Sequence, residues 1–305
     1  MPRTPLIHVG YHKTATTWAQ QLLFVEKYGY RQIADHDDVD RLITRPSSFG
    51  FDADAARTHF TQAMEAAPAG LVPVISSEIL SGHPFRGGHE SALYAQRLKA
   101  IFPEARILCS IRNQLAILPS VYMQYLLRGG TMDHVRFFAG ESTVGYFGFD
   151  PDHFLYHHLV GLYREIFGPR NVLVMTQESL RKDMQAAADR LARFAGVSEP
   201  ALLDTETRRV HAASYPEYAA PLLRRVNQFQ TSLLNPAPVL RLGRTPDGMY
   251  RAAGFVSKRG PFPRLLAGRK PVTTHVRAAF AGRFAESNRA LQAMCPDLDL
   301  SAYET

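Results

Sequence analysis

Four short runs of hydrophobic residues stand out along the chain, and each of them ends in a polar loop. The runs are apolar at almost every position rather than at alternate positions, which is typical of strands buried on both faces of a parallel sheet. They are Leu6–Val9, Val72–Ser76, Arg106–Ile111 and Asn171–Met175.

Between these runs, apolar residues recur at helical spacing. A helix over residues 16–27 would place Trp18 and Leu22 on one face, as expected for a helix that packs on a sheet. The same kind of stripe predicts helices over residues 92–102 and 183–194.

Strand and helix signals alternate across residues 5–196, which predicts an α/β fold. We expect a three-layer sandwich in which a central, mainly parallel sheet is flanked by helices. No Gly/Ser linker or internal repeat divides the sequence, so we expect a single domain over residues 1–305. The stretch 235–271 is rich in Pro and Gly, and we expect it to form a long ordered loop or lid with little regular structure.

Composition excludes several classes of protein. Of the 305 residues, 46% are hydrophobic and 21% are charged, which excludes a mainly disordered chain and a fibrous one. The two cysteines, Cys109 and Cys295, are too few for a disulfide scaffold, and a reducing cytoplasm is the expected location. The chain enters the first strand after Pro5, so no signal peptide is expected, and no run approaches the roughly 18 apolar residues of a membrane span.

Positive charge is concentrated near the end of the chain. Residues 241–283 hold ten Lys or Arg against a single acid, Asp247, within a chain of net charge +7. Such a run is either a solvated basic surface or a site for an anionic ligand. No nucleic-acid-binding motif accompanies it, so we expect no nucleic-acid partner and favour a small polyanion.

The most specific local signal is the segment from Gly10 to Trp18, which connects the first predicted strand to the first predicted helix. A strand–loop–helix unit with Lys13 in the loop and threonines at the helix start forms a cradle for an anion. Thr14 or Thr16 taken alone is also a conventional helix N-cap. The Walker-A pattern of ATPases needs a Gly before the lysine, where this chain has His12.

This segment resembles the phosphosulfate-binding loop of sulfotransferases that use 3′-phosphoadenylyl sulfate (PAPS). The family form is Lys-Ser/Thr-Gly-Thr-Thr, and the matching residues are His12, Lys13, Thr14, Ala15, Thr16, Thr17 and Trp18. Ala15 replaces the usual Gly. The resemblance implies a P-loop-like fold, in which Lys13 meets the leaving phosphate, Thr16 and Thr17 hold the 5′-phosphate, and Trp18 forms a wall of the adenine pocket.

A second segment resembles the 3′-phosphate motif of the same family. The strand over 106–111 is followed by Arg112-Asn113, and Ser120 comes eight residues after the arginine. Arg112 at the strand end and Ser120 on the next helix can both face one phosphate, with the guanidinium supplying a charged fork. The alternative is an arginine in a surface ion pair and a serine that caps a helix after Pro119.

Two weaker similarities to the family follow. Residues 167–197 resemble its late strand and closing helix, and residues 287–300 resemble its C-terminal helix. Many relatives have a tyrosine near the adenine where this chain has Gln177.

Transfer of a sulfuryl group to a hydroxyl needs a general base. Glu78 follows the run over 72–76 and is therefore expected at the carboxyl edge of the sheet, where open α/β sheets bind ligands. His83 is the rival, because cytosolic aryl and steroid sulfotransferases use a histidine there. A strand-end Glu is also a common surface ion-pair member. A sulfuryl group carries less charge than a phosphoryl group, so no metal is required, and no metal site is expected.

The segment Lys258-Arg259-Gly260 loosely resembles a basic flap that closes over the 3′-phosphate in many relatives. The basic region could instead recruit an acidic acceptor such as a sulfated glycan. Aromatic residues are frequent over 121–167, and some of them could line a pocket for the acceptor. We therefore expect a small-molecule, lipid or carbohydrate acceptor.

The sequence predicts a PAPS-dependent sulfotransferase that moves a sulfuryl group to a hydroxyl or amine and releases 3′-phosphoadenosine 5′-phosphate (PAP). One alternative is a P-loop-like kinase, which would want a Gly before Lys13 and an Asp to organise Mg²⁺. The other is a non-catalytic protein that binds PAP or a glycan.

Overall fold

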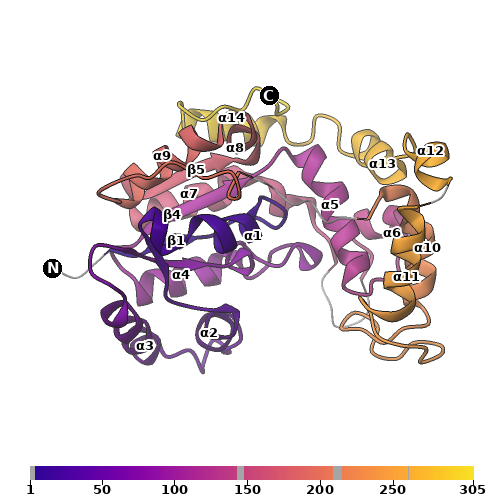
Figure 1. The fold of residues 1–305 in the computed structure, drawn as a ribbon, viewed down its shortest axis with the longest axis horizontal. Helices are drawn as coiled ribbons and strands as arrows, with labels where there is room; N and C mark the ends of the chain where they lie inside the picture. The colour runs from indigo at the N-terminus through magenta and orange to yellow at the C-terminus, as the bar shows by residue number, and fades with distance from the viewer. Residues whose placement is uncertain (1–3, 143–147, 209–214, 260) are drawn as a thin grey trace.

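A parallel β-sheet forms the core of one end of the protein (Figure 1). The computed structural model describes residues 4–142, 148–208, 215–259 and 261–305. The strands run in the order β2-β3-β1-β4-β5, and every neighbouring pair is parallel. Their bounds are β1 Leu6–His8, β2 Tyr30–Gln32, β3 Val72–Ser76, β4 Arg106–Ile111 and β5 Val172–Thr176.

Helices cover both faces of the sheet, which gives the three layers. A large apolar cluster joins one face to α3, α4 and α7, and a second cluster joins the other face to α1 and α9. The α/β sandwich predicted from the sequence is therefore confirmed. The helices of this part are α1 Thr16–Trp18, α2 His36–Val39, α3 Ala53–Ala66, α4 Ser91–Ile101, α7 Tyr156–Phe167, α8 Gln177–Lys182, α9 Met184–Ala195 and α14 Ala285–Met294.

The first helix and the second strand differ from the prediction. The helix expected over 16–27 consists of α1 followed by a π-helical turn, Ala19–Leu23. A π-helical turn holds one residue more than an α-helical turn. The buried side chain is therefore Leu23, where a regular α-helical stripe would bury Leu22. Strand β2 was missed because it has only three residues, two of them polar, and pairs with β3 alone.

Helix α5, Gln114–Leu127, leads from the sheet into a helical lobe at the other end of the molecule (Figure 1). The lobe contains α6 His134–Phe138, α10 Ala220–Asn227, α11 Gly248–Ser257, α12 Phe262–Leu266 and α13 Pro271–Ala279. Among the described residues, no helix has both the length and the apolar character needed to cross a membrane. The apolar cluster beneath the sheet continues into this lobe through α5, α10 and α13. Single-domain organisation stays a prediction.

The expectation of little regular structure over 235–271 was wrong, because α11 and α12 lie within it. Tyr250, Gly254 and Ser257 form a buried stripe on α11. Gly254 is needed there, since a Cβ atom would lie 2.2 Å from the Tyr215 ring. Gly254, which suggested a loop, therefore permits close packing of α11. The proline in the first turn of α12 is at a position where helices tolerate proline.

Candidate functional site

The loop between β1 and α1 is a compact turn with two strained residues. Lys13 and Ala15 have positive φ angles of 69° and 70°, a left-handed conformation that is uncommon outside glycine. Gly10 permits the close folding of this loop, because a Cβ atom would lie 2.7 Å from the Thr16 methyl group and 2.8 Å from His8 Nε2. The loop is thus held in one shape at the start of a helix.

The threonines of the loop do not cap α1. The N-cap residue is Ala15, without a side-chain hydrogen bond, and the Thr14 hydroxyl instead donates to the Tyr11 carbonyl at 2.6 Å. Thr16 is buried and Thr17 is exposed. The first N–H groups of a helix have no partner within the helix, so this turn retains donors that can meet an anion.

Three residues predicted for the site follow three adjacent strands. Lys13 comes after β1, Glu78 lies two residues after the end of β3 and Arg112 comes directly after β4, with β1 in the centre. Partial burial lowers the pKa of Lys13, the positive charge of Arg112 adds to the effect, and the negative charge of Glu78 opposes it. The structure therefore brings these three groups close enough to affect one another electrostatically.

Arg112 and Ser120 are in direct contact, as the eight-residue spacing predicts. Arg112 Nη1 donates to Ser120 Oγ at 3.3 Å across the β4–α5 turn. Burial lowers the pKa of Arg112, as does the charge of Arg181. The structure contradicts the alternative in which Ser120 caps the helix, because Asn113 caps α5 by accepting from Ala116 N.

Glu178 at the start of α8 supports this turn. Its carboxylate accepts from the backbone N–H of Asn113 at 3.1 Å and from the Tyr303 hydroxyl at 3.0 Å. Tyr156 donates its hydroxyl to the Arg112 carbonyl at 2.7 Å. A sequence without three-dimensional information could not assign these three supports, since they come from distant parts of the chain.

A cavity of about 580 Å³ opens beside Arg112 and Ser120. Two further cations line it, Lys270 at the N-cap of α13 and Arg277 in the last turn of that helix, and Tyr215 lines it as well. Glu217 also faces the cavity, but its carboxylate is bound to the N–H and hydroxyl of Thr273. Sequence reasoning did not single out Lys270 and Arg277, although both lie in the basic segment 241–283.

The predicted basic flap lies beside this cavity rather than on its wall. Lys258 Nζ sits 4.8 Å from the centre of the Tyr215 ring, and the Arg259 guanidinium stacks on Phe255 at 3.3 Å. Neither residue lines the cavity. Gly260, the third residue of the flap motif, lies outside the described residues.

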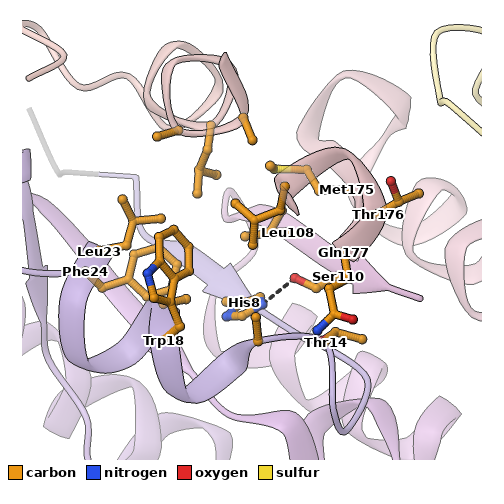
Figure 2. A pocket seen from close by; sticks show the side chains of 16 residues that line it. His8, Thr14, Trp18, Leu23, Phe24, Leu108, Ser110, Met175, Thr176 and Gln177 are labelled. Carbon is orange, nitrogen blue, oxygen red and sulfur yellow. Dashed lines mark hydrogen bonds between the residues drawn. The ribbon is translucent and has the colours of Figure 1, made fainter. Parts of the chain in front are cut away.

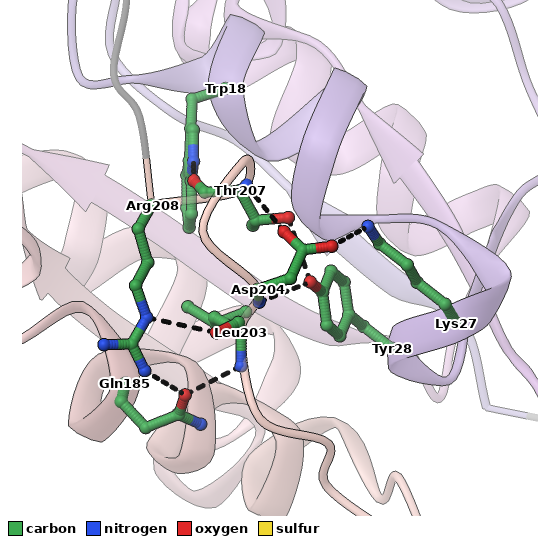
Figure 3. Close-up of polar contacts among 8 residues, drawn as sticks. All are labelled: Trp18, Lys27, Tyr28, Gln185, Leu203, Asp204, Thr207 and Arg208. Carbon is green, nitrogen blue, oxygen red and sulfur yellow. Dashed lines mark hydrogen bonds and ion pairs between the residues drawn. The ribbon is translucent and has the colours of Figure 1, made fainter.

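Trp18 is buried and its indole N–H is fixed (Figure 3). Its Nε1 donates to the Thr207 carbonyl at 2.6 Å. Thr207 belongs to a loop that Asp204 anchors through an ion pair to Lys27 at 2.7 Å and through a bond from the Thr207 N–H. Tyr28 adds a third anchor, because its hydroxyl contacts Thr207 Oγ1 at 2.9 Å.

A small cavity of about 30 Å³ lies between Trp18, Ala15 and Gln177 (Figure 2). Gln177 donates from Nε2 to the Lys13 carbonyl at 3.2 Å. Its Oε1 is buried and has no hydrogen-bond partner among the described residues. A buried amide oxygen without a partner is uncommon and suggests a missing donor.

His8 connects the three central strands beneath the loop. Its Nδ1 lies 2.8 Å from Ser76 Oγ on β3, and its Nε2 lies 2.6 Å from Ser110 Oγ on β4. Burial lowers the pKa of His8 to about 4, although the charge of Glu78 opposes the shift. The ring is therefore neutral at pH 7, and sequence reasoning did not identify this contact.

His12, His83 and His153 gather on the other side of the loop. The rings of His12 and His83 are 6.1 Å apart, and His153 packs on Tyr11 at 4.9 Å. Burial lowers the pKa of each histidine to about 3. Both ring nitrogens of His12 and Nε2 of His153 are buried without a partner among the described residues.

The hydrogen bond of His83 bears on its role as a base. His83 Nδ1 accepts from the Phe85 backbone N–H at 3.3 Å. A neutral imidazole that accepts at Nδ1 carries its proton on Nε2. In this arrangement His83 can donate a hydrogen bond but has no free nitrogen to take a proton.

Comparison with solved structures identifies the fold. The sulfotransferase from Alicyclobacillus acidocaldarius matches 73% of this chain and 90% of its own chain, at 20% sequence identity and a TM-score of 0.50. The chain has a sulfotransferase fold. No protein-family model and no curated protein matches the sequence.

Two more distant structures also match. Mouse sulfotransferase SULT7A1 complexed with PAP covers 98% of this chain and 87% of its own, at 14% identity and a TM-score of 0.40. The sulfotransferase domain from the curacin biosynthetic pathway covers 92% and 98%, at 12% identity and a TM-score of 0.41. The match to the Alicyclobacillus acidocaldarius structure confirms the predicted resemblance to sulfotransferases for the fold.

Among the described residues, the sulfotransferase fold holds no cluster of three or more His, Cys, Asp or Glu side chains that could bind a metal ion.

Proposed function

We propose that the protein is a sulfotransferase that takes its sulfuryl group from PAPS. The observation that carries the proposal is the convergence of the Lys13 loop, Glu78 and the Arg112–Ser120 pair at the carboxyl ends of three adjacent parallel strands. This edge is where open α/β sheets bind ligands. The arrangement supplies cations and backbone donors for two phosphates, and a carboxylate that can accept a proton from the acceptor.

The residues present fit a nucleotide that carries both a 3′-phosphate and a phosphosulfate. Arg112 and Ser120 would hold the 3′-phosphate. Lys270 and Arg277 would add charge from across the 580 Å³ cavity, whose volume lies within the usual range of ligand pockets. Lys258 and Arg259 stay candidates for a flap that moves towards this group.

The adenine base of the nucleotide would lie between Trp18 and Gln177. The unpartnered Gln177 Oε1 is an acceptor suited to an exocyclic amino group, which adenine has. The cavity there measures about 30 Å³ and must widen to admit a purine, by movement of the Thr207 loop away from the indole. His12, Thr14 and Ala15 belong to the phosphosulfate loop, and Thr16 and Thr17 would donate to the 5′-phosphate.

Sulfuryl transfer resembles phosphoryl transfer, so its catalysis depends mainly on positioning and on charge stabilisation. The S–O bond to the leaving phosphate breaks while the acceptor oxygen bonds to sulfur. Lys13 stabilises the negative charge that grows on the bridging oxygen. Glu78 accepts the proton of the acceptor hydroxyl.

Glu78 is the better candidate for the general base of the two predicted. Its carboxylate acts on Lys13 electrostatically, and the residue lies two positions after the end of β3. His83 has its Nδ1 engaged with Phe85 N and its proton on Nε2. We assign His83 the role of donating a hydrogen bond to the acceptor.

The proposal is tested by thermal denaturation with PAP or with ATP and Mg²⁺, in wild type and in Arg112→Ala. At about 100 times its Kd, a ligand stabilises the native state by about 2.7 kcal/mol. We expect PAP to raise the melting temperature of wild type and Arg112→Ala to reduce that shift. Arg193→Ala, at an exposed position on α9, is the matched control.

A shift with ATP and Mg²⁺ alone would replace the proposal by a kinase. A PAP shift without turnover of PAPS on any acceptor would indicate a non-catalytic nucleotide-binding protein.

A further inference from the structure

Large apolar side chains are exposed together in one part of the helical lobe. Leu233, Val239 and Leu265 are 85%, 80% and 74% exposed. The others in this stretch are Leu234, Leu240, Leu242, Phe255, Val256 and Phe262. Isolated exposed apolar residues are normal, but a concentration within one segment marks an interaction site.

The loop over residues 233–242 carries five of these nine side chains, and hydrogen bonds hold it in place. Val239 N and Leu242 N donate to the carbonyls of Gln228 and Phe229, at 3.1 and 2.9 Å. Asn227, which is fully buried, binds the carbonyl of Gly130 through its amide and accepts from the Thr245 hydroxyl. Hydrogen bonds therefore hold the backbone of this loop in place while its leucine and valine side chains are exposed to water.

Helix α11 continues this surface. Its inward stripe is buried, and its outward side presents Phe255 and Val256. Arg251 lies four residues before Phe255 on the same face of α11. The guanidinium of Arg259, which follows the helix, stacks on the Phe255 ring at 3.3 Å. Helix α12 has no buried residue, and it adds Leu265 beside further cations.

Cations alternate with the apolar side chains over the same residues. Between 233 and 270 the exposed cations are Arg241, Arg244, Arg251, Lys258, Arg259, Arg264, Arg269 and Lys270. The only acid in this stretch is Asp247, which lies 3.7 Å from Arg251. We call the described residues of 233–270 the basic–apolar surface.

We propose that the basic–apolar surface docks on an anionic lipid bilayer. A bilayer interface offers negative headgroups to the cations and an acyl region to the leucine, valine and phenylalanine side chains at the same time. Lys270 also lines the nucleotide cavity, but no other residue of the basic–apolar surface does. The variants that test the surface leave Lys270 unchanged, so the proposal does not rest on the proposed sulfotransferase activity.

The charge of the surface argues against other occupants. A second copy of this chain would bring the same cations together, and like charges repel. A nucleic-acid duplex or an acidic polysaccharide would satisfy the cations but would leave the apolar side chains in water.

The test is sedimentation of the purified full chain with vesicles of phosphatidylcholine alone or with about 30 mol% phosphatidylserine, which supplies the negative surface potential. One variant, Arg241→Glu with Arg264→Glu, reverses two exposed charges. Its control reverses two exposed charges far from the surface, Arg170→Glu with Arg193→Glu. Both pairs change the net charge equally.

A second pair of variants tests the apolar contribution. Leu233→Ser with Val239→Ser removes two exposed apolar side chains from the surface, and Phe49→Ser with Leu202→Ser removes two that are equally exposed elsewhere. All eight positions are exposed, so the variants should fold, and unchanged circular dichroism verifies this.

We expect binding to the anionic vesicles only. Each basic residue near such a surface contributes about 1 kcal/mol, so the charge reversal should weaken binding by more than about tenfold. The serine pair should weaken it as well, and both controls should bind like wild type. Absence of binding, equal binding to both kinds of vesicle, or loss in the controls would overturn the proposal. So would full retention of binding by the serine pair, which would indicate a purely electrostatic polyanion site.

Discussion

Two buried histidines, His8 and His153, and two half-buried ones, His12 and His83, should make the stability of this protein fall steeply in mild acid. Burial lowers the pKa of His8 to about 4 and the pKa values of His12, His83 and His153 to about 3. In the unfolded chain a histidine titrates near 6.5. At pH values between the folded pKa and the unfolded pKa, the unfolded state binds more protons than the native state. The free energy of unfolding therefore falls as the pH falls.

The magnitude follows from the two pKa values of each histidine. For an unfolded pKa near 6.5 and a folded pKa of 4 or lower, one histidine costs about 2 kcal/mol between pH 7 and pH 5. The four together cost about 7–8 kcal/mol, which is a large share of the roughly 5–15 kcal/mol that keeps a typical domain folded. The loss is complete only when the pH reaches the folded pKa values.

The assay is urea unfolding at pH 7, 6 and 5, followed by the fluorescence of Trp18, the only tryptophan of the chain. His8→Asn should reduce the loss between pH 7 and pH 5 by about 2 kcal/mol, because one proton no longer takes part. His36→Asn, at an exposed position, is the control for loss of a histidine side chain. A wild-type loss below about 2 kcal/mol would refute the reasoning, since a single buried histidine already accounts for that much.

Three further predictions concern the site. Ala15→Gly should raise the melting temperature by about 1–3 °C, because the relief of about 1–2 kcal/mol of left-handed strain exceeds the entropy cost of glycine; calorimetry against Ala19→Gly, a position with helical φ, checks it. Glu78→Gln should lower kcat for PAPS by about 10²–10⁴-fold, and His83→Gln by less than about tenfold, measured with the same acceptor; the reverse order would make His83 the base. Gly88→Ala should destabilise the protein, since its Cβ would lie 2.1 Å from His153 Nδ1, and a melting temperature equal to wild type would contradict this packing.

Much of the fold could be predicted because its strands are buried on both faces. The runs at 72–76 and 106–111 match β3 and β4 residue for residue, since continuous apolar segments leave little choice of register. Strand β2 lies at the edge and carries polar residues, so it gave no such signal. The sequence did not predict helix α11, because Gly254 was interpreted as part of a loop. In the structure this glycine permits the close contact with the Tyr215 ring.

The site could be predicted where its residues lie close together in sequence. The Arg112–Ser120 contact spans eight residues and was expected, and the Lys13 loop is a continuous segment. Lys270 and Arg277 reach the Arg112 cavity only because α13 packs against α5, a contact between segments more than a hundred residues apart. No local pattern carries that information.

The same distinction explains the contacts that hold the loop in place. His8 contacts Ser76 and Ser110, which are 68 and 102 residues away, and Trp18 contacts Thr207, which is 189 residues away. His8 connects the strand before the Lys13 loop to β3 and β4. Thr207 fixes Trp18 in the helix after the loop. Because the loop also stores strain at Lys13 and Ala15, these distant contacts are what keeps its donors in position for an anion. A short motif can therefore supply the binding groups of such a site, while the long-range packing of the whole chain supplies their geometry.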